Sequence, residues 1–256
     1  MTIIRSTRLL LAACFTFSFT GLATNCPAAE KPFTHPGILH SQAELDFVKT
    51  KVAAAQQPWA SAWEELRSHA ISGLDWRPNP IANVVRGAYN RPDIGGTNLL
   101  RDGAAAYSHA IQWYITGEPP YAKKATEILN AYAITLKSIG GHDARLLAGM
   151  SGITFANAAE ILRHTQARWS EQDQKQFERL LRDVFYGTIK DFYPTANGNW
   201  DAAMIQTMLA MGVFLDDREM FQRAVDYVMS DNGNGKLERL QIATATERRI
   251  LVVDDE

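Results

Sequence analysis

Cysteine is nearly absent from this sequence: the 256 residues contain only Cys14 and Cys26. Both lie in an N-terminal stretch where two arginines precede the apolar run LLLAACFTFSFTGLA and small residues follow in TNCPAAE. This order is typical of a secretory signal peptide. We therefore predict a signal over residues 1–29, cleaved after Ala28 or Ala29. The mature chain would have no disulfide and no thiolate chemistry.

The tetrapeptide Leu-Ala-Ala-Cys at residues 11–14 offers an alternative reading of this stretch. It is similar to a lipoprotein box, which would place a lipid anchor on Cys14. However, the apolar run continues well beyond Cys14, whereas a lipoprotein box should end it. We therefore favour the cleaved signal and a periplasmic or secreted protein.

A strong charge of either sign is also missing, because the formal net charge is −2. Loss of Arg5 and Arg8 with the signal would change it by −2, to −4. This balance argues against a nucleic-acid partner. No apolar run after residue 30 approaches the length of a membrane span, so we expect no membrane partner after signal removal. A polyanionic ligand would have to be held by local arginines and not by the electrostatic field of the whole protein. We expect a monomer.

Strand patterns are scarce, and the apolar spacing after residue 30 is mostly helical. Ser41 and Glu44 form a capping box that predicts a helix over 41–56, and a second helix follows over 59–70. Later helices come in pairs, each with an apolar first helix and an amphipathic second one: 98–117 with 118–139, 144–165 with 170–193, and 199–215 with 217–230. Such pairs are typical of the inner and outer layers of an α/α toroid or a solenoid.

Residues 73–96 contain three prolines and four glycines and are predicted to form a loop. Loops of this length in compact domains are often functional. Arg86, Tyr89 and Arg91 could supply cationic and stacking groups for an acidic sugar, or they could belong to a solvated surface loop.

The stretch NGNW, residues 197–200, precedes a long apolar helix. Asn199 is a candidate N-cap, but the same loop could present amides and the Trp200 ring to a ligand. His142 follows two glycines at another helix start, where a polar cap and a site role are both open. We expect His109 to be a core residue and His164 to interact with a helix dipole.

Three stretches, residues 99–133, 148–165 and 197–228, resemble alginate-lyase-type polysaccharide lyases with an (α/α) toroid. The resemblance extends over about residues 35–235, and we assign residues 30–235 to this domain. It implies an all-α, exported enzyme that cleaves uronate-containing polysaccharide by β-elimination, with no metal or organic cofactor.

The resemblance also implies roles for individual residues. In the family an asparagine precedes an aromatic residue at this helix start and neutralises the substrate carboxylate. Asn199 matches it and Asn197 could assist, while Trp200 would stack on a sugar or be a core aromatic. Neutralising the carboxylate makes the proton on C5 removable by a tyrosine or histidine base, whose identity stays open. His142 is a candidate for a catalytic or binding role.

The chain departs from the family pattern after residue 235. In relatives the next segment carries an arginine, a histidine and often the tyrosine base, whereas residues 236–256 match none of this. The ending RILVVDDE is similar instead to the first strand of a receiver domain, and we leave Asp254 and Asp255 unassigned. We expect an incomplete toroid that lacks part of the catalytic set and can be inactive for that reason.

Two other functions are considered beside the lyase. An (α/α) glycoside hydrolase needs two carboxylates across a cleft, for which Asp102 and Asp201 are the candidates, since Asp173 and Glu178 belong to a cap or an outer helix. A non-catalytic carbohydrate-binding protein would keep the groove without turnover.

Overall fold

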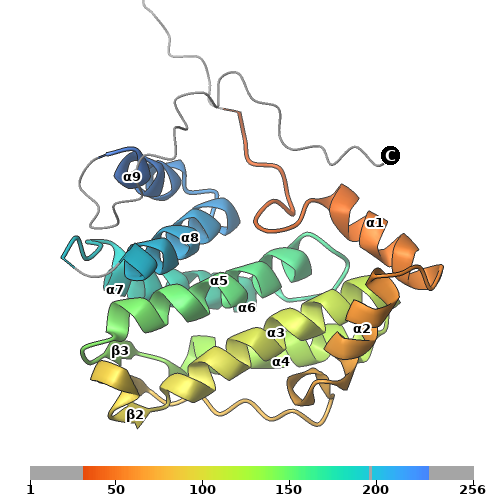
Figure 1. The fold of residues 1–256 in the computed structure, drawn as a ribbon, viewed down its shortest axis with the longest axis horizontal. Helices are drawn as coiled ribbons and strands as arrows, with labels where there is room; N and C mark the ends of the chain where they lie inside the picture. Colours follow the sequence, from red (N-terminus) through yellow and green to blue (C-terminus); the bar gives the residue numbers. More distant parts are fainter. Residues whose placement is uncertain (1–30, 196–197, 231–256) are drawn as a thin grey trace, which may run out of the picture. The chain divides into compact units, whose positions relative to one another are not determined.

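The computed structural model describes residues 31–195 and 198–230 of the chain, and these residues are mostly helical (Figure 1). The α-helices are α1 Gln42–Ala53, α2 Trp59–Ser68, α3 Gly96–Thr116, α4 Pro119–Thr135, α5 Ala144–Arg163, α6 Glu171–Leu180, α7 Gly187–Ile189, α8 Gly198–Phe214 and α9 Arg218–Met229. Short 3₁₀-helices, η1 Ala70–Ser72 and η2 Ala88–Asn90, and a π-helical segment, η3 Leu181–Tyr186, complete the helical part. The all-α prediction is confirmed.

Several helix starts follow the sequence signals. The Ser41 hydroxyl accepts a hydrogen bond from the backbone N–H of Glu44, and the Glu44 carboxylate accepts one from the backbone N–H of Ser41, so the capping box forms as predicted. Ser170 and Asp217 cap α6 and α9 with their side chains, which accept the backbone N–H groups of Asp173 and Met220. Each cap satisfies a backbone donor that the first helical turn leaves without a partner.

Three short strands were not predicted. β1 Asn83–Arg86 pairs in parallel with β3 Ser138–Gly140 and antiparallel with β2 Asp93–Ile94, so the sheet order is β2-β1-β3. The expectation that the helix after residue 118 runs to residue 139 is therefore wrong. The chain leaves α4 at Thr135 and adds a strand beside β1 before it enters α5.

The predicted hairpin layers are present. α3 packs against α5 and α5 against α8, while α4 packs on α3 and α6, and α9 packs on α8. Figure 1 shows α3, α5 and α8 side by side. The apolar helices thus form an inner layer covered by amphipathic ones, as expected for an array of helical hairpins. Closure of these hairpins into a toroid stays a prediction, as do the domain bounds 30–235.

The three inner helices run parallel to one another. Gly96 of α3 approaches Leu147 of α5, and Gly103, about two helical turns later, approaches Phe155. The contacts therefore advance in the same direction along both helices. Gly149 and Gly152 of α5 approach Ala203 and Thr207 of α8 in the same manner. A Cβ on Gly149 would lie 2.6 Å from the backbone of Ala203, so α5 and α8 can touch only because glycine stands there. The N-terminal ends of all three helices therefore lie at one end of the layer.

A buried carboxylate joins the 73–96 segment to this layer. Asp102, 2% exposed, accepts hydrogen bonds from Trp76 Nε1 at 2.9 Å, the backbone N–H of Asn79 at 2.8 Å and the Tyr132 hydroxyl at 2.7 Å. A carboxylate with this many donors is stable in the interior. His109 is fully buried, as predicted for a core residue, and burial lowers its pKa to about 4.

Candidate active site

Several polar side chains gather where the strands meet the N-terminal ends of α5 and α8. β1 ends at Arg86, and β3 ends at Gly140, immediately before residues 141–143 lead into α5. Because β1 and β3 are parallel neighbours, Arg86 lies beside the 141–143 turn. The sheet that the sequence did not predict thus positions a cation next to a histidine–aspartate pair.

Gly141 makes this close approach possible. Its φ angle is +92°, in the region that side-chain-bearing residues rarely adopt, and a Cβ there would lie 2.3 Å from the carbonyl oxygen of Arg86. The same carbonyl accepts a hydrogen bond from the backbone N–H of Asp143 at 2.9 Å. These contacts fix the turn against the end of β1.

His142 and Asp143 form a hydrogen-bonded pair at this turn. His142 Nδ1 lies 2.7 Å from Asp143 Oδ1. An ionised carboxylate can only accept, so Nδ1 carries the proton and Nε2 of the neutral ring is left as a base. The His142 side chain is 61% exposed, whereas Asp143 is 11% exposed, so the carboxylate is held inside and the imidazole faces solvent.

Arg86 is the least satisfied group in the cluster. Its side chain is 17% exposed, and its Nε lies 3.9 Å from Asp143 Oδ2, an ion-pair distance too long for a good hydrogen bond. Nε and Nη1 are buried and have no hydrogen-bond partner among the residues that the structure describes. A guanidinium in this condition has donors left for a planar anion such as a carboxylate.

Two aromatic rings lie beside the cluster: Trp200 of α8, and Tyr193 in the segment before that helix. The Trp200 ring meets His142 edge-on, with centroids 5.8 Å apart and an interplanar angle of 88°. It also contacts the Tyr193 ring at 5.5 Å, and the Arg145 guanidinium lies 5.0 Å from the Tyr193 centroid. Trp200 is 9% exposed and belongs to the hydrophobic core. Its ring therefore holds His142 in place from the inside.

A model of the alginate lyase family matches residues 82–239, more than half of the chain. The chain belongs to the alginate lyase family. The match includes β1, the inner layer α3, α5 and α8, and every residue of the cluster around Arg86. Comparisons with curated proteins and with solved structures give no significant match. Within the described residues no helix is long and apolar enough to cross a membrane.

The helix start at NGNW differs from the sequence prediction for this alginate lyase family member. α8 begins at Gly198, so Asn199 lies inside the first turn and is not its N-cap. Asn199 is exposed and directly precedes the buried Trp200. Asn197, the other predicted amide, lies outside the described residues. Asn199 therefore does not act as a helix cap, which was the alternative to a binding role for its amide.

The loop between β1 and β2 carries the other predicted binding residues. Tyr89 is 95% exposed and has a positive φ of 53°, and Arg91 is also exposed. A hydrogen bond of 2.8 Å from the Gly87 N–H to the Pro92 carbonyl closes this loop directly after Arg86. Contact of Tyr89 and Arg91 with a ligand stays a prediction.

Sequence reasoning missed three members of the cluster: Asp143, Arg145 and Tyr193. The stretch HDAR at residues 142–145 contained a usable signal, since an aspartate next to a histidine at a helix start can orient the ring. Tyr193 gave none, because only the packing of α8 brings it to Trp200.

The acids considered for a hydrolase are held in the interior. Asp102 is fully engaged as an acceptor, and Asp201 is 5% exposed in the first turn of α8. Burial raises the pKa of Tyr227 to about 12, with Asp201 contributing to the shift. Neither carboxylate is available as one of two acids that face each other across a cleft.

Proposed function

We propose that this chain is an exported polysaccharide lyase that cleaves a uronate-containing polymer by β-elimination at the Arg86–His142 cluster. Membership of the alginate lyase family supports the lyase class. The observation that carries the proposal is the buried Arg86 guanidinium, two of whose nitrogens have no hydrogen-bond partner within residues 31–195 and 198–230, beside an exposed, carboxylate-oriented histidine. The protein would act as a monomer in the periplasm or outside the cell, on a chain of acidic sugars.

Arg86 would bind the carboxylate of the uronate at the cleavage point. The C5 proton of a uronate is weakly acidic because the adjacent carboxylate is negative. A guanidinium that hydrogen-bonds this carboxylate stabilises the enolate that develops when the proton leaves. Exposed Asn199 would add a neutral amide, and the positive N-terminal ends of α5 and α8 favour the same negative charge.

His142 would be the base. Its Nε2 takes the C5 proton, the C4–C5 double bond forms, and the bond from C4 to the glycosidic oxygen breaks. When proton and leaving oxygen lie on the same face, the imidazolium can return the proton to that oxygen, which balances the reaction. Asp143 would orient the ring and stabilise its charged form, as an aspartate does in other catalytic histidine pairs.

The remaining predicted residues would act on neighbouring sugars. Tyr89 and Arg91 lie on the exposed loop that follows Arg86 and would contact the acidic chain beyond the cleavage point. For Trp200 its burial favours support of His142, with little ring surface left for a sugar. We therefore propose Trp200 as a positioning residue.

The deciding experiment is an ultraviolet assay for the unsaturated uronate product, with alginate, glucuronan and other polyuronates as substrates. We expect an absorbance rise with the parent chain and its loss in Asn199→Ala. Gln206→Ala, an exposed amide on the same helix α8, is the matched control and should retain activity. Equal rates in all three proteins would refute the role of Asn199.

Two other results would point to the alternatives. Binding of polyuronate without any absorbance rise would indicate a carbohydrate-binding protein. Saturated products that contain oxygen from water would indicate a hydrolase.

A further inference from the structure

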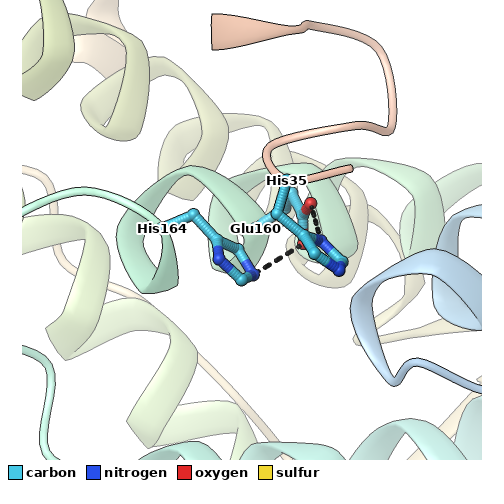
Figure 2. A group of neighbouring side chains, drawn as sticks. All are labelled: His35, Glu160 and His164. Carbon is cyan, nitrogen blue, oxygen red and sulfur yellow. Dashed lines mark hydrogen bonds and ion pairs between the residues drawn. The ribbon is translucent and has the colours of Figure 1, made fainter. Parts of the chain in front are cut away.

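A second polar cluster lies at the opposite end of α5. Glu160 and His164 are one helical turn apart near the C-terminal end of α5, and His35 reaches them from the N-terminal segment (Figure 2). Their potential ligand atoms all lie within 4.8 Å of one another. α5 has 20 residues, so at 1.5 Å per residue about 30 Å of helix separates this cluster from His142.

The contacts within the cluster leave two facing atoms unsatisfied. His35 Nδ1 lies 2.7 Å from Glu160 Oε1, which also accepts the backbone N–H of Gly37 at 3.0 Å. Glu160 Oε2 and His164 Nε2 lie 3.6 Å apart, and both are buried without a hydrogen-bond partner in the described part of the chain. Glu160 itself is 1% exposed. An unpaired carboxylate oxygen in the interior is costly, and a cation would satisfy it.

We propose that His35, Glu160 and His164 form a binding site for a divalent transition-metal ion of the zinc type. Two imidazoles and one carboxylate are a ligand set that Zn²⁺ uses, with a water in the fourth position. Zinc bonds of about 2.1 Å in a tetrahedron place ligand atoms about 3.4 Å apart, close to the separations found here. The His35 and His164 rings, now stacked at 4.2 Å and 10°, would tilt to aim their nitrogens at one ion.

Groups around the cluster would support a bound ion. His35 Nε2 lies 3.2 Å from Asp216 Oδ1, so this N–H can donate to a carboxylate while Nδ1 binds metal, an arrangement common among zinc-bound histidines.

The function of this site would be structural. The three ligands join the segment before α1 to the end of α5, and Asp216 adds the turn between α8 and α9. A metal here would fix the N-terminal segment to the inner layer. This inference is independent of the proposed lyase activity, because the cluster at Arg86 lies at the other end of α5.

The test is a Zn²⁺ titration of the full chain by calorimetry, with metal content measured after dialysis. The protein should carry no polyhistidine tag, and Cys14 and Cys26 should be replaced by serine because thiolates also bind zinc. We expect one ion per chain and at least tenfold weaker binding in Glu160→Gln and His164→Asn. Asp216→Asn should weaken binding about tenfold or more, as loss of an outer partner does. His69→Asn, an exposed histidine, is the control and should bind like the parent.

Absence of stoichiometric zinc in the parent would overturn the proposal, as would equal affinity in the parent and the ligand variants. If the ligand variants do not fold, the Co²⁺ spectrum of the parent decides the question. Visible bands of a four-coordinate nitrogen and oxygen site support the proposal, and the spectrum of hydrated Co²⁺ refutes it. Neither readout depends on turnover, so failure here would leave the proposed lyase activity untouched.

Discussion

Replacement of Arg86 by methionine should separate function from stability. Methionine keeps an unbranched stem of similar length in the space beside β1 but removes the guanidinium. Two buried nitrogens of this group have no hydrogen-bond partner in the part of the chain that the structure describes, and each such donor typically costs about 1–3 kcal/mol. Removing these two donors should recover part of that cost and so raise the free energy of unfolding. Asp143 loses its ion-pair partner at 3.9 Å but keeps the hydrogen bond from His142.

These opposing effects nearly cancel, so we expect the free energy of unfolding to change by only about 1 kcal/mol in either direction. Activity should behave differently. If Arg86 binds the substrate carboxylate, its loss should lower kcat/KM by about 10²–10³, which corresponds to about 2.7–4 kcal/mol of transition-state stabilisation. The kcat/KM of Arg86→Lys should lie between those of the parent and of Arg86→Met, because lysine keeps the charge without the bidentate geometry.

The assay combines urea unfolding, followed by circular dichroism, with the ultraviolet rate on the preferred polyuronate. Arg101→Met is the matched control, since Arg101 is an exposed arginine of α3 whose guanidinium lies over the Trp76 ring. An Arg86→Met protein that keeps the parent kcat/KM would show that Arg86 does not bind the substrate carboxylate. So would a loss of several kcal/mol of stability, which would make Arg86 a structural residue.

Three further predictions concern His142, Gly141 and Asp217. His142→Gln should lower kcat by about 10²–10⁴ while far-ultraviolet circular dichroism stays unchanged, because a largely exposed base is lost; equal activity would exclude His142 as the base. Gly141→Ala should lower the free energy of unfolding by about 1–3 kcal/mol and reduce activity, because alanine is strained at φ +92° and meets the Arg86 carbonyl; calorimetry showing an unchanged Tm would contradict this. Burial alone would raise the pKa of Asp217, but the Met220 N–H and Arg182 outweigh it and lower this pKa, so the carboxylate stabilises the fold above its unfolded pKa of about 3.9 and loses this effect as the pH falls further. Asp217→Asn should therefore be less stable than the parent at pH 7, with a difference that shrinks below about pH 4; a constant difference across this range would contradict the assignment.

Helices were the predictable part of this fold, because their signals are local. The capping box at Ser41 and Glu44 formed as the sequence indicated, and the alternation of apolar and amphipathic helices gave the correct two layers. Strands β1 and β3 were missed because each is only three or four residues long, and they are stabilised by pairing between segments more than fifty residues apart. Such pairing leaves little periodicity to read in either segment.

The roles of single residues were likewise predictable where they depend on local sequence and not where they depend on distant partners. His109 was correctly predicted as a core histidine, because it lies among apolar residues at helical spacing. His164 lies at the C-cap of α5, so its predicted place at a helix C-terminus is confirmed, but its ring also stacks on His35 and lies 3.6 Å from Glu160. A C-terminal helix position is visible in sequence, but the partner that arrives from residue 35 is not.

Local sequence patterns were enough to predict the helical layers, the family and the chemical types of residue that could form a site. They could not show that Arg86 lies beside Asp143, that Trp200 supports His142, or that His35 meets Glu160. Helix formation depends on neighbours three or four residues away, whereas these sites depend on contacts across the layers. Those contacts are set by strand pairing and by the close packing of α5 against α8.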